Sequence, residues 1–175
     1  NGTQSQYLVN KLNNFQISSG DILRSEINDD TIIGKQIIND MNEGKFVSDE
    51  IVNELIEKLI HEPKKKDKFI FDGYPRSLSQ AKNLDLLLDN SNQTINHIFF
   101  LNVNKDTIIK RIEKRKVLEN RSDDELETIL KRYDTYMETT RPVLDFYSKN
   151  LNFHEIDGTQ EINEITRKID TFINV

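Results

Sequence analysis

The sequence of 175 residues predicts one α/β domain in which a parallel sheet is covered by helices on both faces. Three short apolar runs have the length of buried strands, namely Phe69–Phe71, Ile98–Leu101 and Phe153–Ile156. Longer segments with helical spacing separate these runs, and parallel strands need crossovers of that length. Ligands of such sheets bind beyond the carboxyl ends of the strands, so the residues after each run are the first site candidates.

The helices are predicted by apolar residues that recur every three or four positions. One helix is expected to begin near Gly20, where Ser18 and Ser19 are candidate caps and the helix dipole favours the Asp21 carboxylate. The periodic apolar residues are Ile51, Leu55 and Leu59, then Ile108 and Ile112, and finally Leu126, Ile129, Leu130 and Tyr133.

The chain begins with Asn1-Gly2-Thr3-Gln4 and enters an expected helix directly. A parallel sheet of this type normally has an apolar strand ahead of that helix. We therefore expect the parent protein to carry residues before Asn1.

Composition narrows the classes of partner. The formal net charge of −6 and the pI near 5.2 argue against the broad basic surface that binds nucleic acid. No run approaches the roughly 20 apolar residues of a membrane span. There are no cysteines, and His61, His97 and His154 lie far apart in the sequence, so no zinc site is expected. We expect a cytoplasmic monomer that binds neither nucleic acid nor membranes.

Polar residues follow two of the predicted strands. Asp72-Gly73-Tyr74-Pro75-Arg76 comes directly after the first apolar run and places an aspartate and an arginine at the ligand edge. Asp157-Gly158-Thr159 follows the last run. The first of these segments is either a structural turn or part of a binding site.

Four arginines are the third candidate feature. They form either a salt-bridged surface or a phosphate clamp, because the planar fork of arginine suits both carboxylate and phosphate. A clamp would neutralise the charge on a phosphoryl group during transfer. The four are Arg111 and Arg115, which share a helix face, Arg121, which follows a short connection, and Arg132 on the next helix.

Together these motifs resemble those of the adenylate kinases, a family of nucleoside monophosphate kinases. The resemblance runs from Gly2 to the carboxyl end, and its six segments occur in the family's order. They are Gly2-Thr3-Gln4, Ile17–Arg24, Gly44–Glu50, Asp72–Arg76 with Gln80, Arg121-Ser122-Asp123-Asp124 with Arg132, and Asp157-Gly158-Thr159.

The resemblance implies a three-layer fold of the P-loop NTPase type, with a helical NMP-binding insertion and a short lid. The implied core comprises residues 1–29, 68–115 and 124–175. The NMP-binding segment is expected at 30–67 and the lid at 116–123.

On the acceptor side, the resemblance implies a site for AMP. Arg24 and Arg76 would hold its phosphate, and Gln80 and Ser19 would read its base. The full implied set is Ser19, Gly20, Arg24, Lys45, Val47, Gly73, Arg76 and Gln80, with Lys45 and Val47 acting through their backbone.

On the donor side, the resemblance implies a site for ATP and Mg²⁺, with Asp72 and Asp21 orienting waters of the metal. The implied reaction is a reversible, direct in-line transfer from ATP to AMP that yields two ADP. Arg76, Arg115, Arg121 and Arg132 are the implied catalytic residues. The implied ATP-binding residues are Gly2, Thr3, Gln4, Arg111, Arg115, Gly158 and Gln160, with Arg111 stacked on the adenine.

Two departures from the family's pattern bear on activity. The family's glycine-rich loop ends in Gly-Lys-Gly-Thr-Gln, whereas Asn1 stands at the lysine position here and no glycines precede it. The chain alone is therefore expected to have very low activity. Only Lys116 to Asn120 separate Arg115 from Arg121, which resembles short-lid members and leaves no zinc ligands.

Three other interpretations remain open. A UMP/CMP kinase has a similar short lid, although Ser19 and Gly44–Glu50 follow the AMP pattern. A nucleotide-binding module without catalysis would fit the missing lysine. A purely structural α/β protein would leave the ordered arginines and Asp72–Arg76 unexplained.

Overall fold

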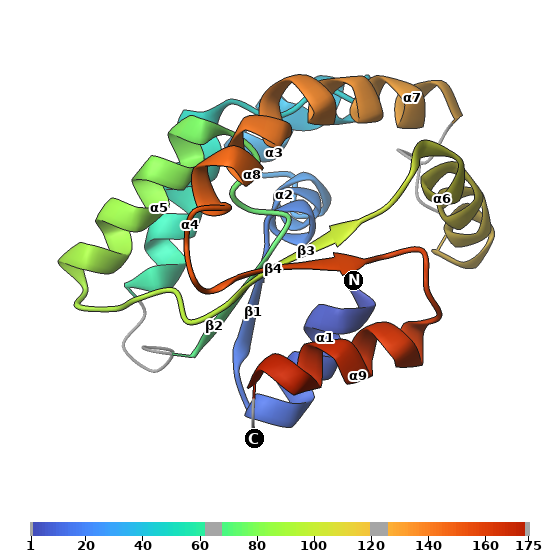
Figure 1. The fold of residues 1–175 in the computed structure, drawn as a ribbon. Coiled ribbons are helices and arrows are strands. Elements are labelled where there is room, and N and C mark those ends of the chain that lie inside the picture. The colour runs from blue at the N-terminus through green and yellow to red at the C-terminus, as the bar shows by residue number, and fades with distance from the viewer. Residues whose placement is uncertain (1, 62–67, 120–125, 174–175) are drawn as a thin grey trace.

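The computed structural model describes residues 2–61, 68–119 and 126–173, without the side chains of residues 115–119 and 126. Its elements are shown in Figure 1. In chain order they are α1 (Thr3–Leu12), β1 (Phe15–Ser18), α2 (Ser19–Asn28), α3 (Ile32–Asn42), α4 (Asp49–Ile60), β2 (Phe69–Asp72), α5 (Leu78–Asn90), β3 (Ile98–Asn102), α6 (Lys105–Glu119), α7 (Leu126–Thr135), the π-helical turn η2 (Tyr136–Thr140), α8 (Arg141–Tyr147), β4 (Phe153–Asp157) and α9 (Ile162–Ile173).

All three predicted strands are present, and each extends one residue further toward its carboxyl end than its apolar run. The four-residue strand β1 was not predicted from the sequence. Only Ile17 of this strand is buried, while Gln16 and Ser18 are polar and half-buried. A strand with one buried apolar residue gives too weak an apolar run to be recognised.

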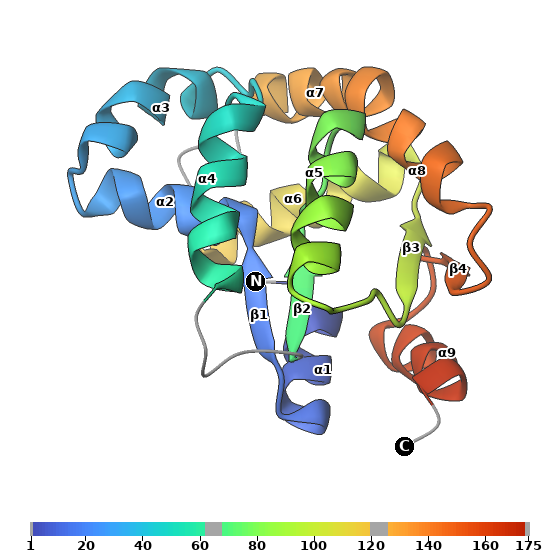
Figure 2. The same ribbon diagram turned by 90° about the vertical axis from the view of Figure 1, so that its left-hand side faces the viewer.

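Helices cover both faces of the strands, as predicted (Figures 1 and 2). On one face, α1 and α9 share an apolar cluster with β4, formed around Leu8, Ile156 and Ile169. On the other face, α5 and α8 pack through Ala81 and Tyr147 against partly buried residues of β3 and β4. The class of fold is therefore mixed α/β with parallel strands between helical layers.

The largest apolar cluster joins the predicted NMP-binding segment to the rest of the molecule. Ile37 of α3 and Ile56 of α4 are almost fully buried and belong to the same cluster as Ile17 of β1 and Leu84 of α5. Residues 30–61 thus have no separate core within the parts described.

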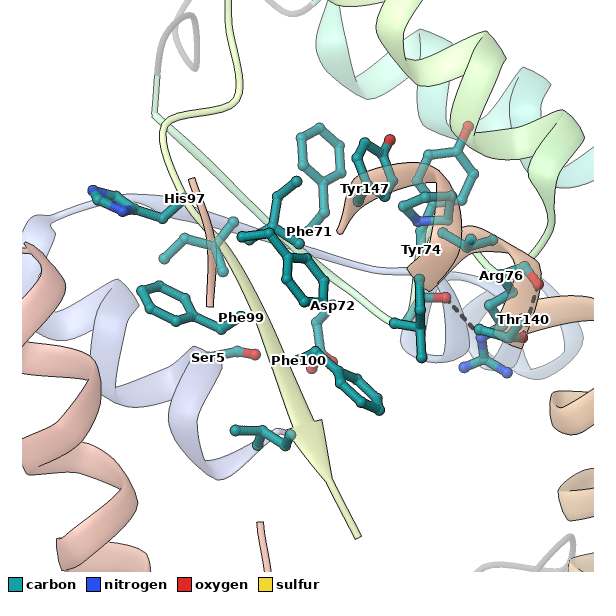
Figure 3. Close-up of a pocket in the computed structure, with 18 of the residues that line it drawn as sticks. Ser5, Phe71, Asp72, Tyr74, Arg76, His97, Phe99, Phe100, Thr140 and Tyr147 are labelled. Atoms are coloured by element: carbon teal, nitrogen blue, oxygen red, sulfur yellow. Dashed lines mark hydrogen bonds between the residues drawn. The ribbon is translucent and has the colours of Figure 1, made fainter. Parts of the chain in front are cut away.

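The strands form two parallel pairs instead of the single predicted sheet. β1 pairs with β2, and β3 pairs with β4. Among the described residues β2 and β3 are not paired, and a largely apolar cavity of about 1470 Å³ is lined by both strands. Figure 3 shows Phe71 of β2 and Phe99 and Phe100 of β3 around it. The strand expected ahead of α1 would precede this chain, so that prediction is not tested.

None of the described helices has the length and apolar character needed to cross a membrane.

Replacing Gly34 with alanine tests how closely α2 and α3 pack. A Cβ at this position would overlap the Glu26 carbonyl of α2. Gly→Ala inside a helix normally stabilises by about 1 kcal/mol, but here we expect Gly34→Ala to destabilise by about 1–3 kcal/mol, because the helices must move apart. Urea unfolding measures this change. Asn39→Ala, at an exposed position of α3, should change stability by less than about 0.5 kcal/mol, and a Gly34→Ala chain as stable as this control would contradict the packing.

Candidate active site

A pocket of about 250 Å³ opens at the carboxyl ends of β1 and β2. The parallel register places Ser18 beside Asp72, so the turns that follow the two strands are neighbours. This is the edge where parallel sheets bind ligands. The pocket is lined by all eight residues predicted to bind AMP: Ser19, Gly20, Arg24, Lys45, Val47, Gly73, Arg76 and Gln80.

The turn from β1 into α2 forms the first wall. The Ser18 hydroxyl accepts the Asp21 backbone N–H at 3.3 Å, which confirms the predicted cap. Ser19 is buried, and its hydroxyl donates to the Gly73 carbonyl after β2. The two turns are therefore joined directly.

Gly73 allows the second wall to bend into the pocket. Its φ of 68° lies in the left-handed region that favours glycine, and a Cβ there would approach the Arg76 guanidinium at 2.8 Å. The Gly73 carbonyl accepts from Arg76 Nε at 2.7 Å as well as from Ser19. The Tyr74–Pro75 peptide that follows is cis.

Arg76 is held by its neighbours from several elements. Its backbone N–H donates to Gln80 Oε1 at 2.7 Å, and its carbonyl accepts from the Thr140 hydroxyl of η2 at 2.8 Å (Figure 3). Its guanidinium lies over the Phe46 ring, 5.2 Å from the centroid. The first two contacts hold the Arg76 backbone, and the Phe46 ring and the Gly73 carbonyl hold its side chain beside the pocket.

Positive charge is concentrated around the pocket. Burial lowers the pKa of Arg76 to about 10, and the charges of Arg132 and Arg24 act in the same direction, while Asp72 opposes them. Arg76 is still protonated at pH 7. Three arginine side chains line one small pocket, so an anion placed among them would relieve their repulsion.

The two aspartates predicted to serve Mg²⁺ have different surroundings. Asp21 forms an ion pair with Arg24. Burial acts to raise the Asp21 pKa, but hydrogen bonds from Arg24 and Ser18 outweigh it and lower the pKa. Asp72 accepts from Gln16 Nε2 at 2.9 Å and lines the pocket. Across the residues described, no group of three or more acidic or histidine side chains could hold a metal ion by itself.

The predicted ATP-binding residues form a second group. Arg111 of α6 donates to the Gln160 carbonyl at 3.4 Å, and the Gly158 N–H donates to the Asn102 carbonyl at the end of β3. Gln4 donates to the carbonyl of Ile162, two residues beyond Gln160. Most of the predicted ATP-binding residues thus lie near the carboxyl ends of β3 and β4.

Other predicted donor-side residues lie elsewhere or cannot be placed. Gly2 lines the pocket at the carboxyl ends of β1 and β2, and Thr3 begins α1 with an exposed side chain. Asn1, Arg121 and the side chain of Arg115 lie outside the described residues, as does the predicted lid from residue 120 onward.

Several contacts, at Arg76 and between the strands β3 and β4, were not predicted from the sequence. Phe46 and Thr140 contact Arg76, but only Phe46 had a local signal, since it lies between two predicted site residues. His97 and His154, far apart in the sequence, have ring nitrogens only 3.3 Å apart because β3 pairs with β4.

Comparisons with known proteins agree with this geometry. The family model described as adenylate kinase matches residues 1–152. A protein of Pelagibacter ubique named adenylate kinase is 46% identical over 200 residues, covering 99% of this chain and 94% of its own length. Proteins of the same name from Prochlorococcus marinus and Mycoplasma capricolum are 40% and 39% identical, over 96% and 89% of this chain and 89% and 84% of their own lengths.

Because the family model matches residues 1–152 and a relative of that name is 46% identical over 99% of this chain, the chain belongs to the adenylate kinase family of nucleoside monophosphate kinases.

Proposed function

We propose that the 250 Å³ pocket binds AMP and that the protein transfers a phosphoryl group from ATP to it, giving two ADP. The observation that carries this proposal is the meeting of Arg24, Arg76 and Arg132 with Gln80 in one pocket. Arginines neutralise and orient a phosphate, and a primary amide can pair with an adenine edge. A single AMP needs both features.

On the acceptor side, Arg24 and Arg76 hold the phosphate while the Gln80 amide contacts the base. Ser19 and Val47 are buried parts of the same wall, and Lys45 contributes its backbone, because its ammonium group is paired with Glu43 at 2.7 Å. The Arg24–Asp21 pair has to loosen, at least in part, for Arg24 to turn its donors to the ligand.

On the donor side, ATP lies toward Arg111, Gly158 and Gln160. An oxygen of the AMP phosphate attacks the terminal phosphorus of ATP in line, so no covalent enzyme intermediate forms. Arg76 and Arg132, with Arg115 and Arg121, neutralise charge on the oxygens in transit. The step needs no proton from the protein, since the attacking oxygen is already anionic.

Mg²⁺ fits the donor side through Asp72. This metal keeps several waters and uses one or two carboxylates beside substrate phosphates, so it needs no cluster of protein ligands. Asp72 lies at the end of β2 near Gly2, where a Cβ would meet its carboxylate. Asp21 is paired with Arg24 and is the weaker candidate. When bound, the metal would neutralise charge on the ATP phosphates.

AMP should be preferred over other monophosphates. AMP at about 100 times its Kd should stabilise the chain by about 2.7 kcal/mol, which is a rise of roughly 5–10 °C in Tm. Thermal unfolding with AMP, CMP, UMP and GMP at equal concentrations measures the preference. A larger rise with CMP or UMP would favour the UMP/CMP kinase alternative.

Arg76→Lys separates the geometry of the guanidinium from its charge. Lysine keeps the charge but cannot make two parallel contacts to a phosphate, so the Kd for AMP should rise roughly 10- to 100-fold. Calorimetric titration measures the Kd, and Arg167→Lys, at an exposed position of α9, is the matched control. Unchanged affinity in the Arg76 variant would remove Arg76 from the phosphate site.

A further inference from the structure

Both polar atoms of the Gln80 amide are already held by protein groups. Its Oε1 accepts the Arg76 backbone N–H at 2.7 Å, and its Nε2 donates to Asp49 Oδ1 at 2.8 Å. Gln80 is only 4% exposed, yet it lines the acceptor pocket. Each amide atom has one further hydrogen-bonding position left for a ligand.

These two hydrogen-bonding partners determine the orientation of the Gln80 amide. A backbone N–H can only donate, and a carboxylate can only accept. Rotating the amide by half a turn would place Nε2 against the Arg76 N–H and Oε1 against the Asp49 carboxylate, giving two repulsive pairs. The Asp49 side chain therefore opposes the reversed amide.

Asp49 is itself held firmly. It is the first residue of α4, where the helix dipole favours a carboxylate. Its Oδ2 accepts the Ser77 hydroxyl at 2.7 Å, and Ser77 also caps α5 by accepting the Gln80 N–H at 3.1 Å. Asp49, Ser77 and Gln80 form a closed set of contacts between α4 and α5.

The orientation of the amide matters for the base that it meets. A purine with a 6-amino group offers a donor at that group and an acceptor at N1, whereas a 6-oxo purine offers the reverse order. The observed amide supplies a carbonyl and an N–H in one fixed order, and the reversed amide would supply the opposite order. A good bidentate pair of this kind discriminates by roughly 5- to 150-fold.

We propose that Asp49 is a positioning and specificity-determining residue, which holds the Gln80 amide in the order that accepts a 6-amino purine and rejects a 6-oxo purine. This inference rests on the proposed function, because it requires Gln80 to face the base of a bound purine monophosphate. Asp49 acts through Gln80 and does not touch the ligand.

The test compares AMP with IMP, which differ at the 6 position of the base. Calorimetric titration of the full chain gives both Kd values and does not depend on turnover. The wild-type chain should prefer AMP by at least about tenfold. Asp49→Asn can face either amide atom, so the ratio of the two Kd values should fall roughly tenfold, mainly through tighter binding of IMP. Asp49→Ala, which opposes neither orientation, should also lower the ratio.

Glu50→Gln is the matched control, since it makes the same charge change at the neighbouring, exposed position of α4. Its ratio should equal that of the wild type. A general loosening of the pocket would weaken AMP and IMP alike and leave the ratio unchanged, and an unchanged ratio in folded Asp49→Asn or Asp49→Ala overturns the inference alone. A wild-type chain with no preference for AMP over IMP would overturn it together with the assignment of Gln80 to the base.

Discussion

The site depends on the Gly73 carbonyl, which accepts from the Ser19 hydroxyl after β1 and from Arg76 Nε after β2. Parallel pairing of β1 with β2 brings these turns together, and the left-handed conformation of Gly73 turns its carbonyl into the space between them. One acceptor thus joins the wall that carries Ser19 to the side chain proposed to hold the phosphate. Without it, the pairing of the strands would still align the turns, but Arg76 would lose the hydrogen bond of its Nε.

The second constraint on the site is the positive charge of the arginine side chains around the pocket. Three arginines line a pocket of about 250 Å³, and the pKa of Arg76 is lowered mainly by burial and further by the charges of Arg132 and Arg24. Asp72 opposes this shift, and Arg24 is paired with Asp21. A cluster of cationic side chains around one pocket is typical of a site that binds an anion. The same pocket has buried apolar parts, such as Val47 and Leu23, which suit a base.

Much of this arrangement could be predicted because its signals are local. Apolar runs marked β2, β3 and β4, the motif Asp72–Arg76 marked the end of a strand, and the resemblance supplied the acceptor residues that the structure brings together. The missed features depend on distant partners. The support of Arg76 by Thr140 joins residues 64 apart, and the pairing of β3 with β4 brings His97 to His154. No pattern along the chain indicates that β2 and β3 lie unpaired beside a cavity.

Titration of the ¹⁵N-labelled chain with AMP, followed by amide chemical shifts, tests the location of the acceptor site most directly. If AMP binds in this pocket, the largest changes should fall in residues 18–24, 44–49 and 72–80, which surround it at the ends of β1 and β2. Residues at the opposite ends of β3 and β4, including His97 and His154, should change little. Largest changes along the 1470 Å³ cavity between β2 and β3, with none in residues 18–24, would contradict the account.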